Sequence, residues 1–165
     1  MTASLPGPPD RTATGRAGEM LVASRFALYG YQVYLPFADN HGVDLTVSAG
    51  EAQHLAVQVK AISYPKTTYA FVYESSFPLV PWMALAVVVF SDPLDTAPPI
   101  YLFSAPEWSN PTKLLRHNTA DTKPYFHVRL GKDWADELEP WLMTPQHVAT
   151  VVSQVRSQLK RDPAC

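Results

Sequence analysis

Two short segments of the chain, Val43–Ser48 and His54–Ala61, alternate apolar residues with polar or small ones. A period of two is typical of strands, because successive side chains point to opposite faces of a sheet. The residues between them, Ala49–Ala52, include Gly50 and suit a hairpin turn. The pattern therefore predicts two antiparallel strands, each with one apolar face.

A helix is expected before this hairpin. Thr12 or Thr14 can cap its start, and Gly30 suits its end after about Tyr29. Apolar residues lie on most sides of the segment, so the helix is expected to be largely buried against a sheet. Glu19 shares an arc with several apolar side chains, and a carboxylate in that position needs a reason.

The rest of the chain carries further elements. Met83–Phe90 is a nearly continuous apolar run, which is typical of a strand covered on both faces. The other expected elements are strands at Tyr31–Leu35, Ile100–Phe103 and Tyr125–Leu130, a short helix beginning at Ala105–Trp108, and helices at Trp134–Leu142 and Gln146–Lys160. This order predicts an α/β or α+β fold, with a mixed central sheet flanked by helices.

Composition narrows the class of protein. The 165 residues suit one domain, and a hydrophobic content of 47% is that of a folded chain. We expect a flexible segment at 1–12 and a single domain at 13–165. No apolar run reaches the roughly 20 residues of a membrane span, so a cytoplasmic protein without membrane contact is expected. The only cysteine, Cys165, excludes an intrachain disulfide or a cysteine zinc site.

Polar residues of the expected hairpin carry candidate chemistry. If the loop is Gly50–Ala52, Asp44 lies opposite Gln58, with Lys60 following on the same face, whereas a one-residue slip would turn the pair to opposite faces. The preceding helix can bring Glu19 within reach. These residue types suit phosphodiester hydrolysis, because Mg²⁺ takes hard oxygen ligands and an ammonium group stabilises developing negative charge.

The arrangement resembles the PD-(D/E)xK nuclease superfamily, which includes restriction endonucleases and archaeal Holliday-junction resolvases. The resemblance rests on Gly15–Glu19 (GRAGE) in the helix, Gly42–Leu45 (GVDL) at a strand start, and Val57–Ala61 (VQVKA) on the next strand. It implies a restriction-endonuclease-like core that binds Mg²⁺ or Mn²⁺ and acts on DNA.

The resemblance also assigns roles to single residues. It makes Asp44 the central metal ligand, Lys60 the catalytic lysine, and Glu19 the helix-borne acidic residue of the resolvase-like branch. Gln58 departs from the usual Glu or Asp, as in a branch with a QxK motif, and removes one negative charge. The metal is then expected near Asp44, Gln58, Glu19 and the carbonyl of Val59.

Each candidate also has an ordinary structural explanation. Asp44 can be a turn residue at a strand entry, and Lys60 a solvated strand lysine. Glu19 can pair with Arg16 near the helix start, where carboxylates are favoured. Gln58 can be neutral filler.

Other residues can touch such a site or a bound nucleic acid. His41 lies three residues before Asp44 and can contact the site, although such a histidine is more often a polar loop residue. The tryptophans can stack on bases, although each more often belongs to a core or an interface; they are Trp82, Trp108, Trp134 and Trp141. The cations that can form a local phosphate-facing patch are Arg11, Arg16, Arg25, Lys60 and Lys66.

Three functions are consistent with the sequence. The first is a Mg²⁺-dependent deoxyribonuclease or a related DNA-processing enzyme. The second is a catalytically silent module that keeps the fold to bind nucleic acid or a protein; the neutral Gln58 and a pI of about 6.2 favour it. The third is an interaction domain that forms homodimers through an apolar aromatic surface. A measurement of metal binding would distinguish the deoxyribonuclease from the other two candidate functions.

Overall fold

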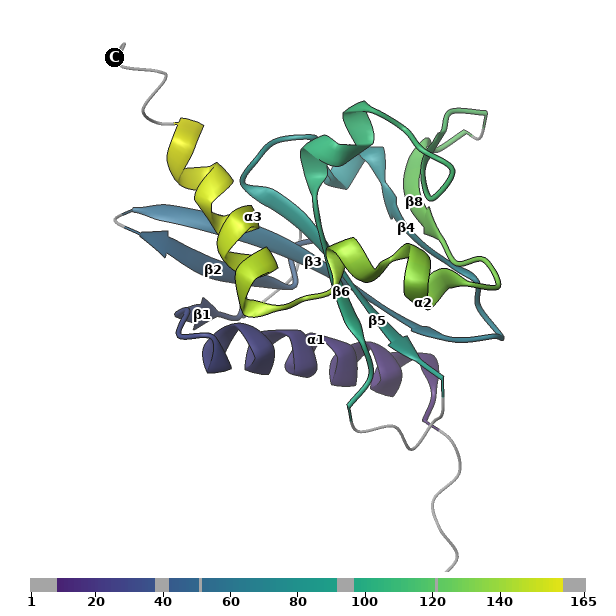
Figure 1. Cartoon of the computed structure of the whole chain (residues 1–165), viewed down its shortest axis with the longest axis horizontal. Helices are drawn as coiled ribbons and strands as arrows, with labels where there is room; N and C mark the ends of the chain where they lie inside the picture. Colours follow the sequence, from purple (N-terminus) through teal and green to yellow (C-terminus); the bar gives the residue numbers. More distant parts are fainter. Residues whose placement is uncertain (1–8, 38–41, 51, 92–96, 121, 159–165) are drawn as a thin grey trace, which may run out of the picture.

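Two sheets of unequal size organise the chain. The larger has five strands in the order β1-β2-β3-β5-β6, in which β3 and β5 run parallel and the other neighbours run antiparallel. The smaller has three antiparallel strands in the order β4-β8-β7. β1 lies toward one end of the molecule and β4 and β8 lie toward the other (Figure 1).

The computed structural model describes residues 9–37, 42–50, 52–91, 97–120 and 122–158. The strands are β1 Val33–Tyr34, β2 Leu45–Gly50, β3 Gln53–Ser63, β4 Tyr69–Tyr73, β5 Met83–Phe90, β6 Ile100–Ser104, β7 Leu115–Asn118 and β8 Tyr125–Arg129. The α-helices are α1 Arg11–Leu28, α2 Trp134–Glu137 and α3 Pro145–Gln158. The 3-10 turns are η1 Glu74–Ser76, η2 Ala105–Ser109 and η3 Glu139–Trp141.

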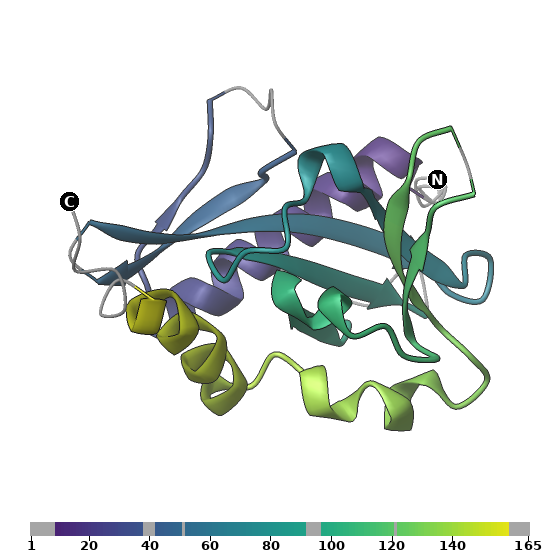
Figure 2. The same ribbon diagram turned by 90° about the horizontal axis from the view of Figure 1, so that it is seen from above.

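The large sheet is covered on both faces. On one face, α1 and α3 contribute apolar side chains to a core that includes Val22, Phe26 and Val151. On the other face, the small sheet and α2 contribute to a second core that includes Val72, Phe126 and Leu138. Figure 2 shows α3 and the small sheet at different ends of the large sheet.

The central strand of the large sheet is β5. Met83 to Val89 are all buried, as the continuous apolar run predicts, because each face of β5 meets one of the two cores. The predicted mixed α/β fold and this buried central strand are both confirmed.

The start of α1 differs from the expectation. Asp10 is the N-cap, and its carboxylate accepts a hydrogen bond from the Ala13 N–H at 2.8 Å. The predicted caps, Thr12 and Thr14, therefore lie inside the helix, where Thr14 donates its hydroxyl to the Asp10 carbonyl. Arg11 and Thr12, which were expected in the N-terminal segment, consequently belong to α1.

The prediction that α1 is largely buried is wrong. Only one stripe, made of Gly18, Val22 and Phe26, is buried, whereas Met20 is 71% exposed and Leu28 is 78% exposed. Because one sheet covers one side of a helix, apolar residues on the remaining sides face outward. The end of α1 was predicted correctly, since Gly30 follows it with a φ of 85°.

Three further differences concern element limits. The strand expected at Tyr31–Leu35 is confined to β1, and β4 and β7 were not expected at all. The helix expected at Trp134–Leu142 is broken into α2 and η3, because Pro140 lacks the N–H that a continuous helix needs. Two residues of the predicted elements lie outside the described residues: Glu51 in the hairpin loop and Lys160 at the end of the last helix.

None of the helices in the described part of the chain combines the length and the apolar character of a membrane-spanning segment.

Candidate active site

Asp44 stands immediately before β2, at the edge of β3. The register pairs Leu45 with Val57, as predicted, and brings Asp44 to the level of Gln58. The predicted loop is wrong, because Gly50 belongs to β2 and pairs with Gln53, and a register shift between Ser48 and Gly50 restores the predicted pairing. The half-buried Asp44 side chain accepts a hydrogen bond from the Val59 N–H through Oδ2 at 2.6 Å. Its own N–H donates to the Val57 carbonyl at 3.0 Å. The carboxylate is therefore held against β3 beyond the end of β2.

The Val59 carbonyl points toward the same edge. In a strand, the N–H and C=O of one residue lie on the same side of the backbone. The Val59 N–H is directed to Asp44, whereas the Ala56 N–H is directed the other way, to Trp82 beside β5. A carboxylate and a main-chain oxygen thus face the same side of β3.

Gln58 is the buried polar residue of this region, with 6% of its surface exposed. Its Oε1 atom is buried and has no hydrogen-bond partner among the described residues. A buried oxygen without a partner calls for an explanation such as an ion or a water molecule. Gly42 borders the same amide: a Cβ there would lie 3.0 Å from Gln58 Nε2, and its φ of 74° also favours glycine.

Lys60 lies two residues further along β3, on the same side of the strand as Gln58 by alternation. It borders a hollow of about 580 Å³ that is also lined by Arg11, Lys66 and Thr14. Three of the five cations predicted to form a phosphate-facing patch therefore meet at one hollow. Their positive charges suit a phosphate backbone.

Glu19 has a different partner. Its Oε2 atom accepts a hydrogen bond from Arg16 Nη1 at 2.6 Å, which is the ion pair that the sequence offered as the ordinary explanation. α1 packs on the opposite face of β3 from Gln58: a Cβ on Gly18 would lie 2.8 Å from the Ala61 Cβ. The convergence of Glu19 with the other three residues stays a prediction.

The donor set is sparse and made of oxygen. Within the described residues, no three His, Cys, Asp or Glu side chains come together as a metal site. The oxygen atoms that remain are the Asp44 carboxylate, the unpartnered Gln58 Oε1 and the Val59 carbonyl. This set fits Mg²⁺ or Mn²⁺, which bind through few protein oxygens and keep several waters. His41 lies outside the described residues.

Sequence reasoning missed a row of aromatic residues beside this region. Tyr69, Phe71 and Tyr73 occupy one face of β4, and the first two also line the hollow that Lys60 borders. The available signal was an aromatic residue at every second position of 69–73. Two of the tryptophans offered as base-stacking residues, Trp108 and Trp134, are instead buried in the core.

A mixed five-stranded sheet with flanking helices matches the restriction-endonuclease-like fold. The structure is similar to that of the bacterial homing endonuclease I-Ssp6803I, with a TM-score of 0.53, 15% identity, and coverage of 93% of this chain and 99% of that chain. It also matches Hjc, a Holliday junction resolvase from Archaeoglobus fulgidus, with a TM-score of 0.49, 13% identity, and coverage of 79% and 98%. No protein-family model matches the sequence, and no curated protein does.

Proposed function

We propose that this chain is a metal-dependent nuclease that hydrolyses phosphodiester bonds in DNA. The observation that carries the proposal is the Asp44 carboxylate, which is hydrogen-bonded to the Val59 N–H between Gln58 and Lys60. This is the position at which the PD-(D/E)xK resemblance expects a metal ligand. The likeness to the homing endonuclease supports the fold on which the proposal rests.

The residues of the site would have separate roles. Asp44, Gln58 Oε1 and the Val59 carbonyl would hold Mg²⁺ or Mn²⁺ and leave room for water. When bound, the ion polarises the phosphate and lowers the pKa of a bound water. Lys60 supplies an ammonium group that stabilises negative charge on the phosphate. Glu19 adds a second carboxylate only if its ion pair with Arg16 opens.

The test is DNA cleavage with matched variants. Wild type, Asp44→Asn and Lys60→Ala are incubated with plasmid, single-stranded and branched DNA in Mg²⁺, Mn²⁺ or EDTA. Each variant is expected to lose about 10²–10³ in rate, because one preorganised electrostatic contact is removed. Asparagine keeps an oxygen that can accept the Val59 N–H, so Asp44→Asn should fold normally.

Asp136→Asn and Lys132→Ala are the controls, since both residues are exposed and lie on or before α2. They should cut at the wild-type rate. If wild type cuts and Asp44→Asn cuts equally well, the active site lies elsewhere.

The second candidate function is a catalytically silent module that binds nucleic acid or a protein. It is favoured by the neutral amide of Gln58 in the place where most of the superfamily has a carboxylate. An amide oxygen is a weaker Mg²⁺ ligand than a carboxylate. A wild-type protein that binds DNA but cuts no substrate in either metal would support this second function.

A further inference from the structure

The outward face of the small sheet is rich in aromatic and basic side chains. β4 presents Tyr69, Phe71 and Tyr73, while the alternate residues Ala70 and Val72 are buried against the large sheet. The register places Arg129, His127 and Tyr125 of β8 beside these three aromatic residues in turn. Arg116 and Asn118 of β7 complete the face beside His127 and Tyr125.

The rings form one continuous surface. Along β4, the Phe71 ring centroid lies 6.0 Å from that of Tyr69 and 5.4 Å from that of Tyr73. Across the strands, Phe71 lies 5.5 Å from Tyr125, and Tyr125 lies 5.5 Å from His127. Tyr69 and Tyr73 are 47% and 43% exposed, so the surface is open to a ligand.

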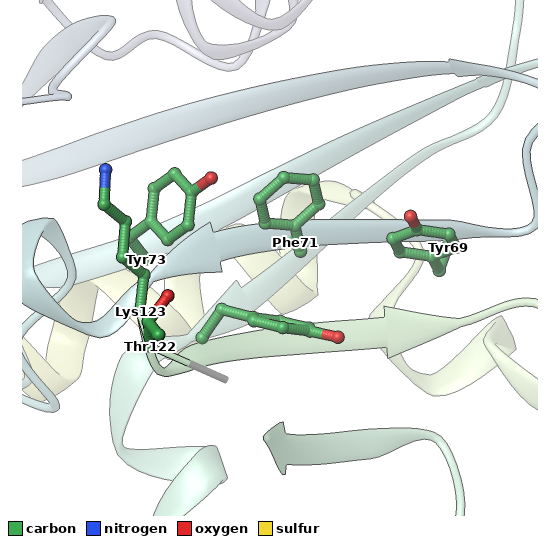
Figure 3. Close-up of a pocket in the computed structure, with 6 residues that line it drawn as sticks. Tyr69, Phe71, Tyr73, Thr122 and Lys123 are labelled. Carbon is green, nitrogen blue, oxygen red and sulfur yellow. The ribbon is translucent and has the colours of Figure 1, made fainter. Parts of the chain in front are cut away.

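A shallow pocket of about 290 Å³ lies on this surface (Figure 3). Figure 3 shows the side chains of Tyr69, Phe71 and Tyr73 along the strand, with Lys123 beside Tyr73. The Lys123 Nζ atom stands 5.9 Å from the Tyr73 ring centroid. A cation held beside aromatic rings can contact a phosphate while a base stacks on a ring.

The charge of the face is positive. Arg116, Arg129 and Lys123 are exposed on it or at its rim. The outward positions of the three strands all lie in the described part of the chain, and none of them is acidic. The surface therefore attracts an anionic ligand, although the chain as a whole has a net charge of -2.

The aromatic face adjoins the hollow that Lys60 borders. Tyr69 and Phe71 line both the pocket on the small sheet and the hollow that Lys60 and Lys66 border. None of the described residues that line the two pockets is acidic, so a ligand that lies along β4 would reach Lys60 without passing a negative charge in them.

We propose that the outward face of the small sheet binds single-stranded DNA and leads it toward Asp44 and Lys60. The inference deepens the proposed nuclease function and rests on it for the choice of DNA. Unpaired bases have exposed π-faces that stack on aromatic rings, whereas bases in a duplex are already stacked on one another. The phosphates would contact Lys123, Arg116 and Arg129.

The test measures binding without cleavage. A labelled oligothymidylate of about 16 nucleotides is titrated with the full chain in EDTA, and its fluorescence anisotropy is followed. Tyr73→Ala is expected to weaken binding about fivefold or more, because it removes one stacking ring. Tyr73→Phe keeps the ring and should bind like wild type, which excludes a merely structural loss.

Tyr34→Ala is the matched control, because Tyr34 is 44% exposed on β1 and also contacts a neighbouring ring, that of His54. It should leave binding within about twofold. Lys123→Gln should reduce the slope of log affinity against log salt by about 0.7, the contribution of one phosphate contact on a single strand.

Several outcomes would overturn the inference. They are equal binding by Tyr73→Ala and wild type, equal losses in Tyr73→Ala and Tyr34→Ala, tighter binding of a duplex of the same length, and tighter binding of the matching oligouridylate. Because EDTA prevents metal-dependent cutting, the two proposals fail separately. A protein that binds in this way but cuts nothing loses only the nuclease proposal, and one that cuts but shows no effect of Tyr73→Ala loses only the binding face.

Discussion

The two sheets use similar β-forming residues but differ in what covers them. β5 of the large sheet has a core on each face, and Met83 to Val89 are buried. β4 of the small sheet buries Ala70 and Val72 but leaves Tyr69 and Tyr73 exposed. A continuous apolar run therefore indicates a strand that is covered on both faces. Aromatic residues at every second position, alternating with small apolar ones, here mark a strand that is covered on one face only. The exposed aromatic face of β4 is therefore the candidate binding surface.

The largest expected effect compares the cores of the two sheets. Leu85→Ala in β5 should lower the free energy of unfolding by about 2–5 kcal/mol, since it leaves a cavity at a fully buried position. Tyr73→Ala should cost about 1 kcal/mol or less, because its ring is already half in water. Urea denaturation of both variants measures the difference. Equal losses would mean that the outward face of β4 is covered after all.

A smaller effect tests how tightly α1 covers the large sheet. Gly18→Ala should destabilise the protein by about 1–3 kcal/mol, because the added Cβ would meet the Ala61 Cβ at 2.8 Å. Gly15→Ala in the same helix is the matched control, as its Cβ would have no atom within 4 Å. That variant should gain about 0.5–1 kcal/mol from helix propensity. Thermal unfolding of both proteins should therefore shift in opposite directions.

The metal-binding role proposed for Gln58 in the large sheet can be tested by measuring metal affinity. Gln58→Glu should bind Mn²⁺ about tenfold or more tightly than wild type, because a negative charge replaces a neutral amide. In EDTA the same variant should be less stable than wild type, since a buried carboxylate lacks a partner there. Calorimetric titration and thermal unfolding measure the two effects. Gln53→Glu on the same strand is the control, and an equal gain in its affinity would show that position 58 holds no ligand.

The smallest effect concerns His127 on the small sheet. Burial lowers the pKa of His127 below 6.5, and the charges of Arg116 and Arg129 lower it further. The unfolded chain therefore takes up this proton first, so stability present above about pH 6.5 declines as the pH falls toward the folded-state pKa. Solvent screening limits the loss to about 0.5 kcal/mol or less.

The measurement compares unfolding free energies at neutral and mildly acidic pH. Wild type should lose slightly more stability on acidification than His127→Gln. A larger loss in His127→Gln would contradict this assignment.

Much of the first half of the fold was predictable, because its contacts are local. The pairing of β2 with β3 was predicted correctly, and with it the position of Asp44 opposite Gln58, although a register shift between Ser48 and Gly50 produces it and not a loop at Gly50–Ala52. β4 was missed because its partner β8 lies far along the chain, and a five-residue strand carries a weak pattern. The exposed sides of α1 were missed because an apolar pattern does not say how many neighbours a helix has.

The candidate site was predictable in part for the same reason. Spacing along two paired strands places Asp44, Gln58 and Lys60, but the partner of Glu19 depends on side-chain rotamers and on the face of β3 to which α1 packs. Neither property follows from periodicity. The aromatic face could not be assembled from sequence, since it needs the register between β4, β8 and β7.

The hydrogen bond from the Val59 N–H to Asp44 has a second consequence. β3 is longer than β2, so β3 continues past the end of its neighbour. No other strand of the described residues pairs with this side of β3. Such an edge can pair with a strand of another molecule, and natural proteins discourage this with charged side chains at the edge. Asp44 occupies one main-chain donor of this edge and adds a charge beside it. The residue proposed to anchor a metal therefore also protects the chain against edge-to-edge aggregation.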